Sequence, residues 1–262
     1  LHTQRRRQRQ MCIRDRLVTP QMQSFEAGEK VRDNPHMKLE EIDVPNWDYD
    51  YDFWSESKVE LEGRTINFNR IIMPMNENEE EMISWLKKME LDAVVCSGSR
   101  RNVSIWEKWM SPTETLFRAA AKSGIPTLGI CFGHQLLCHS LGSKVERAEK
   151  FSSGIWNLEL TKEGENDELL TNHTENIREI ATLFSHQDHV MSVPKNCTLL
   201  SRTSHNDITA IRVNDDLGNP LPAWGIQFHP EAARKRIERA YGWGHISEAV
   251  SYTHLTLPTT LS

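Results

Sequence analysis

The stretch that decides the fold is IPTLGICFGHQLLCHSLG, residues 125–142. Its first part, IPTLGI (125–130), is a short apolar run of the kind that forms a buried parallel strand. Its second part, GHQLLCHSLG (133–142), is typical of a helix that ends at Gly142. Between them, Gly129-Ile130-Cys131-Phe132-Gly133 has the spacing Gly-x-nucleophile-x-Gly. This spacing predicts a sharp turn from strand to helix, with a nucleophile at its tip.

Cys131 is the candidate nucleophile at this turn. The flanking glycines let the strand and the helix pass without a clash between Cβ atoms. The helix N-terminus offers free N–H groups and a positive dipole, which favour the thiolate, and the backbone N–H of Phe132 would face a developing oxyanion. The alternative is a buried structural cysteine, the usual fate of a free cysteine. Cys138, which lies among apolar residues of the same helix, is expected to be such a core residue.

Upstream of this turn, strand patterns alternate with helix patterns. The expected strands are RTINFNRIIM (64–73) and LDAVVCSG (91–98), and the expected helices are EEEMISWLKKM (79–89) and TETLFRAAAKSG (113–124). KLEEIDV (38–44) is a further possible strand, unless the true first strand is missing. Strands that alternate with helices imply a parallel sheet covered on both faces.

Downstream of residue 142 the pattern changes to shorter strands joined by polar turns. The expected strands are KFSSGIWNLELT (150–161), CTLLSRTS (197–204), ITAIRVND (208–215) and PAWGIQF (222–228). Residues 162–194 are expected to form a long polar connection, and 231–241 to start a helix. The predicted fold is therefore a single α/β domain with a mostly parallel sheet and a smaller antiparallel strand region.

The two ends of the chain are related through the genetic code. Residues 3–15, TQRRRQRQMCIRD, can be encoded by a DNA segment whose reverse complement translates as VSYTHLTLPTTLS, which is residues 250–262. Inverted copies of one DNA segment therefore flank the reading frame, as sequencing-adapter DNA would. We expect 1–15 to be an artefactual leader, 16–63 a poorly defined segment, 64–249 the functional domain, truncated or not, and 250–262 an artefactual tail.

Composition narrows the class of protein. The chain of 262 residues has 31 Lys and Arg against 37 Asp and Glu, a net charge of −6, and it is more acidic still without the arginine-rich leader. An acidic surface argues against nucleic acid or an anionic membrane as partner. No apolar run approaches the length of a membrane-spanning helix. The cysteines outside the leader form neither a C-x-x-C pair nor a disulfide framework, so a reducing cytoplasm is expected.

A second motif, QFHPE (227–231), follows a predicted strand near the end of the domain. Residues i and i+2 of an extended segment project from the same side, so His229 and Glu231 can both turn toward Cys131. Pro230 fixes the backbone between them. His229 would act as the base and Glu231 would hold its tautomer, as in a catalytic triad. Without the cysteine, the same tripeptide would be an ordinary surface turn.

LGICFGHQLL (128–137) and the later H-P-E motif resemble those of the class I glutamine amidotransferases, over roughly residues 64–240. The resemblance implies a flavodoxin-like, three-layer domain with the triad Cys131, His229 and Glu231. It also implies a second oxyanion donor in the turn after the preceding strand, where Gly98 is the candidate beside Phe132.

The resemblance also implies that Gln135 lines a glutamine pocket. FSHQDHVMSVP (184–194) resembles the H-x-D-x-V segment of the GMP-synthase-like standalone branch, which places Ser185 and His186 at the substrate. His186, Asp188 and His189 could suggest a metal site, but no further ligand set is evident, so neither metal nor cofactor is expected.

Three functions are compatible with these residues. The first is glutamine hydrolysis that supplies ammonia to a synthetase domain or subunit, and the second is a standalone γ-glutamyl peptidase or hydrolase. The third is a binding or regulatory protein of the same fold that lacks catalysis. The intact Cys131, His229 and Glu231 argue against the third function, whereas the sequence does not separate the first two.

Overall fold

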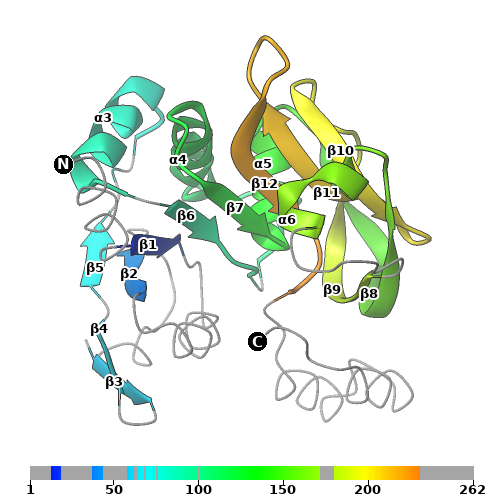
Figure 1. Ribbon diagram of the computed structural model, residues 1–262, viewed down its shortest axis with the longest axis horizontal. Coiled ribbons are helices and arrows are strands. Elements are labelled where there is room, and N and C mark those ends of the chain that lie inside the picture. The colour runs from blue at the N-terminus through cyan, green and yellow to red at the C-terminus, as the bar shows by residue number, and fades with distance from the viewer. Residues whose placement is uncertain are drawn as a thin grey trace, which may run out of the picture.

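The computed structural model describes Pro74 and residues 76–91, 93–99, 101–171 and 180–230, together with the backbone of five strands nearer the N-terminus. These strands are β1 (Ile13–Val18), β2 (Met37–Asp43), β3 (Lys58–Leu61), β4 (Arg64–Asn67) and β5 (Asn69–Ile72). The chain forms a mixed α/β fold around one large sheet, with a small separate ribbon of β3 and β4 (Figure 1).

The first half of the large sheet is parallel. Its strands follow the order β5-β2-β1-β6-β7-β12, where β6 is Ala93–Cys96, β7 is Thr127–Ile130 and β12 is Pro220–Ile226. Every neighbouring pair in this half is parallel. Without the edge strand β5, the order in the chain is 2-1-3-4-5, which is compatible with the flavodoxin-like arrangement. The carboxyl ends of these strands therefore meet at one edge, where ligands bind in open α/β sheets.

The second half of the sheet is antiparallel and continues from β12. Its strands are β11 (Asn206–Asn214), β10 (Cys197–Thr203), β8 (Val145–Leu160) and β9 (Ile180–Val190). Each pairs with the next in an antiparallel manner. The smaller antiparallel region expected from the sequence is thereby confirmed. In Figure 1 it lies beside α5, on the side of the sheet away from β5.

Three helices pack next to one another along the parallel half: α3 (Glu79–Met89), α4 (Met110–Lys122) and α5 (Phe132–Ser140). α3 begins where Asn78 accepts hydrogen bonds from the N–H groups of Glu80 and Glu81, and basic residues lie in its last turn, so both helix ends are stabilised. The bounds predicted for α3 are confirmed, and α4 begins three residues before the predicted helix. The short helices η2 (Gly164–Asn166) and α6 (Glu168–Thr171) follow β8. Among the described residues one helical layer is seen, and the second layer of the expected three is not.

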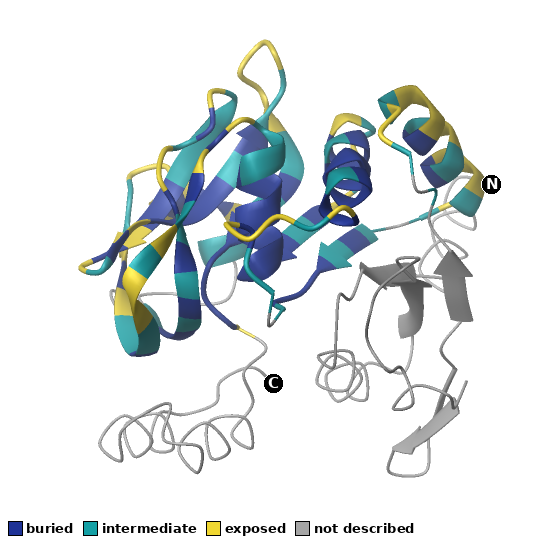
Figure 2. Ribbon diagram, turned by 180° about the vertical axis from the view of Figure 1, so that it is seen from behind, coloured by how far each residue is buried: buried dark blue, intermediate teal, exposed yellow. Residues whose placement is uncertain are grey.

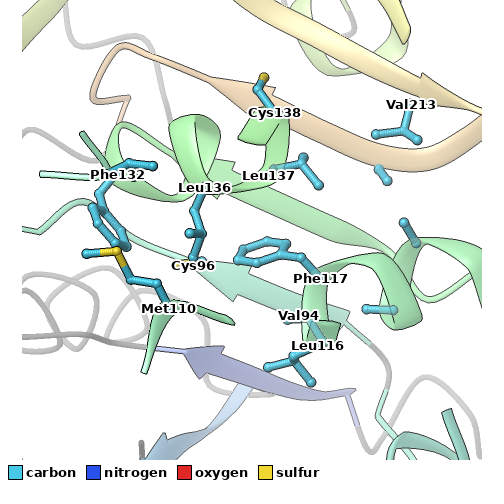
Figure 3. Close-up of a cluster of buried hydrophobic side chains, with 14 of the residues drawn as sticks. Val94, Cys96, Met110, Leu116, Phe117, Phe132, Leu136, Leu137, Cys138 and Val213 are labelled. Atoms are coloured by element: carbon cyan, nitrogen blue, oxygen red, sulfur yellow. The ribbon is translucent and has the colours of Figure 1, made fainter. Parts of the chain in front are cut away.

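Two apolar clusters form the core. The larger lies between the helices and the sheet and includes Val94, Phe117, Leu136 and Leu137 (Figure 3). The smaller lies inside the antiparallel half and includes Phe184, Phe228 and Cys131 itself. Figure 2 shows α5 and its neighbouring strands as the most deeply buried part of the chain. Each fully buried large apolar side chain contributes about 1.5–3 kcal/mol, so the buried residues of α5 stabilise the turn at Cys131.

Two predicted elements are wrong. The single strand expected at 64–73 is two strands, because β4 pairs with β3 in the small ribbon whereas β5 pairs into the large sheet. The polar connection expected at 162–194 contains the eleven-residue strand β9. The strand suggested at 38–44 is confirmed as β2. β1 pairs between β2 and β6, and its residues 13–15 belong to the segment predicted to be a foreign leader. The helix expected from residue 231 lies outside the described residues.

Candidate active site

Cys131 occupies a strained turn between β7 and α5. Its backbone angles are φ 51° and ψ −101°, outside the regions that side-chain-bearing residues normally adopt. The Cys131 N–H donates to the carbonyl of Ile226 at 2.8 Å, and its carbonyl accepts the N–H of Gln135 at 3.1 Å. Both bonds fix the turn, so Cys131 stands at the N-terminus of α5 with its backbone held on two sides.

The two glycines around Cys131 are required by close backbone contacts. A Cβ on Gly129 would lie 2.5 Å from the carbonyl oxygen of Gly133, and a Cβ on Gly133 would lie 2.2 Å from that of Cys96. Both distances are far below van der Waals contact. The glycines of the motif therefore allow α5 to pass against β7 and β6, as the spacing predicted.

The strand register brings the predicted oxyanion donor level with the nucleophile. Cys96 of β6 pairs with Gly129 of β7, so Gly98 and Cys131 each lie two residues beyond a paired position. Gly98 is buried at the end of β6, and Phe132, whose N–H is the other candidate donor, is the first residue of α5. The Phe132 ring stacks on Trp109 at 5.6 Å between centroids. Gly98 and Phe132 thus flank Cys131 from neighbouring segments.

His229 enters from the third adjacent strand. Ile226, the last residue of β12, pairs with Ile130 of β7, and His229 follows three residues later. The His229 N–H donates to the carbonyl of Leu183 at 2.9 Å, and its side chain is buried. The carboxyl ends of β6, β7 and β12 therefore carry Gly98, Cys131 and His229 to one edge of the sheet.

β9 crosses this edge and contacts the nucleophile. The Sγ of Cys131 lies 3.8 Å from the carbonyl oxygen of Ser185, close enough for a weak S–H hydrogen bond. Ser185, predicted to face the substrate, is thus next to the nucleophile through its backbone. The neighbouring His186 is buried, and its Nδ1 lies 3.0 Å from the carbonyl oxygen of Asp188. A carbonyl only accepts hydrogen bonds, so Nδ1 carries the proton and Nε2 bears a lone pair.

The imidazoles of His186, His189 and His205 form a cluster, with ring centroids 4.8–6.4 Å apart. Burial, together with the neighbouring His189, lowers the pKa of His186 to about 3, and burial lowers the pKa of His205 to about 4. Burial also lowers the pKa of His189. These histidines are therefore neutral near pH 7. Within residues 74–230, as far as described, no three His, Cys, Asp or Glu side chains are arranged to hold a metal ion.

The other cysteines are held as thiols. Burial raises the pKa of Cys96 and of Cys138, and raises that of Cys197 to about 12. Cys138 packs within the larger core cluster, as predicted. Among the described cysteines, Cys131 alone stands at the N-terminus of a helix.

Gln135, predicted to line a glutamine pocket, is hydrogen-bonded within the protein. Its side chain is buried, and its NH2 group donates to the carbonyl of Asp188 at 2.9 Å and to Oε1 of Gln227 at 3.0 Å. Glu231, the predicted orienting residue, lies outside the described residues. Sequence reasoning did not single out Ser104, whose contact with Asp188 joins the loop after β6 to β9. No sequence signal marks this pairing of residues far apart in the chain.

The fold and the strained turn at Cys131 define an α/β protein with a candidate site at this cysteine. Residues 54–241 match the family model of class-I glutamine amidotransferase, and the chain belongs to this family. It is similar to one subunit of the glutamine-hydrolyzing GMP synthase of Pyrococcus abyssi, with 36% identity over 42% of this chain and 52% of that protein. It is also similar to the glutamine-hydrolyzing GMP synthase of Thermus thermophilus, with 33% identity over 62% of this chain and 28% of that protein.

The solved structure of a glutamine amidotransferase from Thermotoga maritima superposes with a TM-score of 0.61 at 18% identity, covering 92% of this chain and 90% of that one. This likeness supports the same overall fold. The chain spans about half of the Pyrococcus protein and a smaller share of the Thermus enzyme. No helix among the described residues is both long and apolar enough to span a membrane.

Proposed function

We propose that this protein hydrolyses the γ-amide of glutamine through a cysteinyl γ-glutamyl thioester and supplies the ammonia to an acceptor on a separate synthetase domain or chain. The observation that carries the proposal is the strained turn at Cys131, which lies level with Gly98 and beside the strand that leads to His229. A residue held at this φ, at a helix N-terminus between two obligatory glycines, has the backbone geometry of a nucleophile on a strand-to-helix turn.

The first half-reaction is an acyl transfer from nitrogen to sulfur. The Sγ of Cys131 gives its proton to His229 and bonds to the δ-carbon of glutamine. The carbonyl oxygen becomes an oxyanion that accepts the N–H groups of Phe132 and Gly98. The C–N bond breaks as His229 returns the proton to the leaving nitrogen, and ammonia departs.

The second half-reaction hydrolyses the thioester. His229 takes a proton from water, the water oxygen bonds to the δ-carbon, and the same donors stabilise the second oxyanion. The C–S bond then breaks, the sulfur regains its proton and glutamate leaves. In this scheme Glu231 holds the His229 tautomer, as the H-P-E spacing suggests.

The curated relatives support ammonia supply over peptide hydrolysis. Two of them are glutamine-hydrolysing GMP synthases, and the Pyrococcus protein is named as one subunit of such an enzyme. We therefore propose a separate synthetase chain or domain as the acceptor partner, in the cytoplasm. The same catalytic residues would also serve a γ-glutamyl peptidase. The test therefore compares glutamine with γ-glutamyl peptides as substrates.

The test measures glutamate release from glutamine and from a panel of γ-glutamyl peptides, using the full chain. The variant Cys131→Ala is compared with Cys138→Ala, which removes a thiol from the buried side of the same helix. We expect Cys131→Ala to abolish release and Cys138→Ala to retain it. Mass spectrometry of an acid-quenched reaction is expected to find the γ-glutamyl group on the peptide containing Cys131.

Two results would overturn the proposal. One is glutamate release that survives in Cys131→Ala. The other is a folded wild-type protein, verified by circular dichroism, that releases no glutamate with either substrate class and forms no thioester. Release from γ-glutamyl peptides in strong preference to glutamine would assign the peptidase function instead.

A further inference from the structure

Asp188 lies at the point where β9 meets the loop that follows β6. Its carboxylate is buried, with 1% of the residue exposed. One carboxylate oxygen accepts the backbone N–H of Ser104 at 2.8 Å, and the other accepts the Ser104 hydroxyl, also at 2.8 Å. Both oxygens act as acceptors at short distance, which is the arrangement that suits a carboxylate.

The Ser104 loop is the continuation of the segment that carries Gly98. It leaves β6 at Cys96, and Val103, next to Ser104, is buried in the larger core cluster. Asp188 therefore holds this loop from the side of the site. A backbone N–H is a useful oxyanion donor only if its loop keeps one position, because the donor must lie about 3 Å from the oxyanion.

The backbone carbonyl of Asp188 holds a second segment. It accepts the NH2 group of Gln135 from α5 at 2.9 Å and faces Nδ1 of His186 at 3.0 Å. The same NH2 group donates to Gln227 at 3.0 Å, two residues before His229. Since an NH2 group has two hydrogens, both donors of Gln135 are used inside the protein.

We propose that Asp188 is a positioning residue that fixes the Gly98 loop through its side chain and the nucleophile helix through its backbone, and that Gln135 belongs to this network. The inference rests on the proposed function and concerns the same site. Gly98, Cys131 and His229 lie on three segments that are far apart in the chain. Asp188, with Gln135, touches a neighbour on each of them. This network explains why a strand at the edge of the sheet buries a carboxylate.

The kinetic test exploits the difference between asparagine and alanine at position 188. In Asp188→Asn, the amide oxygen still accepts the Ser104 N–H and the NH2 donates to the Ser104 hydroxyl, which accepts as readily as it donates. We expect kcat within about threefold of wild type, since no hydrogen bond is lost. In Asp188→Ala both bonds are lost, and kcat is expected to fall by about 10- to 100-fold with little change in KM, since removing an oxyanion donor outright costs about 10²–10³.

A double-mutant cycle separates positioning from general destabilisation. Ser104→Ala alone removes one hydrogen bond and is expected to lower kcat by about two- to tenfold. Added to Asp188→Ala, it is expected to lower kcat no further, because Ser104 acts through Asp188. Asp216→Ala, in the turn at the far end of β12, removes an exposed carboxylate and serves as the control with unchanged activity.

Hydrogen exchange provides a readout that does not depend on activity. In Asp188→Ala the Ser104 amide is expected to exchange at least tenfold faster, whereas amides of the β10–β11 hairpin stay unchanged. Unchanged exchange at Ser104, or additive effects in the cycle, would overturn the inference. If Asp188→Asn loses as much kcat as Asp188→Ala, the charge rather than the position matters, and the inference fails. A wild-type protein without activity would refute the proposed function alone, because exchange at Ser104 still decides the contact.

Discussion

The strain at Cys131 predicts that glycine at this position gives a more stable fold than alanine does. Residues held in sparsely populated backbone regions cost about 1–3 kcal/mol each, and Cys131 has φ 51° and ψ −101°. Glycine adopts such angles without a Cβ clash, but it costs about 0.5–1 kcal/mol in unfolded-state entropy relative to alanine. The difference leaves Cys131→Gly more stable than Cys131→Ala by about 1 kcal/mol, although both lack the thiol.

The assay is urea unfolding of the two variants side by side. For a chain of this size, 1 kcal/mol corresponds to roughly 2–4 °C in Tm, so thermal unfolding gives an independent value. The matched control is the exposed residue Ser84, in the middle of α3. There the backbone is helical, and Ser84→Gly is expected to be less stable than Ser84→Ala by about 1 kcal/mol.

The sign of the stability difference between Cys131→Gly and Cys131→Ala decides whether the turn is strained. If Cys131→Gly is less stable than Cys131→Ala by the amount seen at position 84, the turn carries no strain. The geometric argument for a nucleophile on a strained turn would then be refuted. If either variant had the same glutaminase activity as wild type, the catalytic role of Cys131 itself would be refuted.

Two further predictions concern the turn at Cys131 and the buried histidines. Gly133→Ala places a Cβ 2.2 Å from the Cys96 carbonyl oxygen. It is expected to cost about 1–3 kcal/mol or more and to lower kcat; a variant with normal stability in urea unfolding would contradict this packing. The pKa values of His134, His186 and His205 are lowered to about 4, 3 and 4, in each case mainly by burial, so these groups stay neutral in the fold while the unfolded chain takes up protons below pH 6.5. Their stabilisation is complete above pH 6.5 and falls by up to about 1.4 kcal/mol per pH unit for each group as the pH drops toward the folded values. His205→Asn, which keeps a donor toward Thr203, is expected to reduce that slope, and an unchanged slope in urea unfolding between pH 4 and 7 would count against the burial argument.

Local signals made the parallel half of the fold predictable. Short apolar runs marked β6 and β7, and apolar residues at helical spacing marked α3. The two glycines around Cys131 predicted the turn because their spacing is a local pattern, although the contact that requires Gly133 comes from Cys96 of β6. Such features follow from sequence because the pattern that marks them is local.

The strand β9 was not predicted because polar residues occupy part of its buried face. Along Phe184–Val190 the buried positions alternate as in any strand with one buried face, but His186 and Asp188 occupy two of them. A search for alternating apolar residues therefore finds only a polar segment. The hydrogen bonds that satisfy Asp188 come from Ser104 and Gln135, which are distant in sequence. Only the register of the sheet reveals that three separate segments meet there.

The two buried polar residues of β9 differ in how well their polar atoms are satisfied, and this difference separates their roles. Burying a polar group without a partner costs about 1–3 kcal/mol in proteins. Asp188 meets this cost with hydrogen bonds to both carboxylate oxygens and to its carbonyl. By contrast, Nε2 of His186 is buried without a hydrogen-bond partner among the described residues. A satisfied group adds rigidity, whereas an unsatisfied acceptor keeps its capacity to accept a hydrogen bond. Asp188 therefore fits a positioning role, whereas the substrate-facing role of His186 stays a prediction.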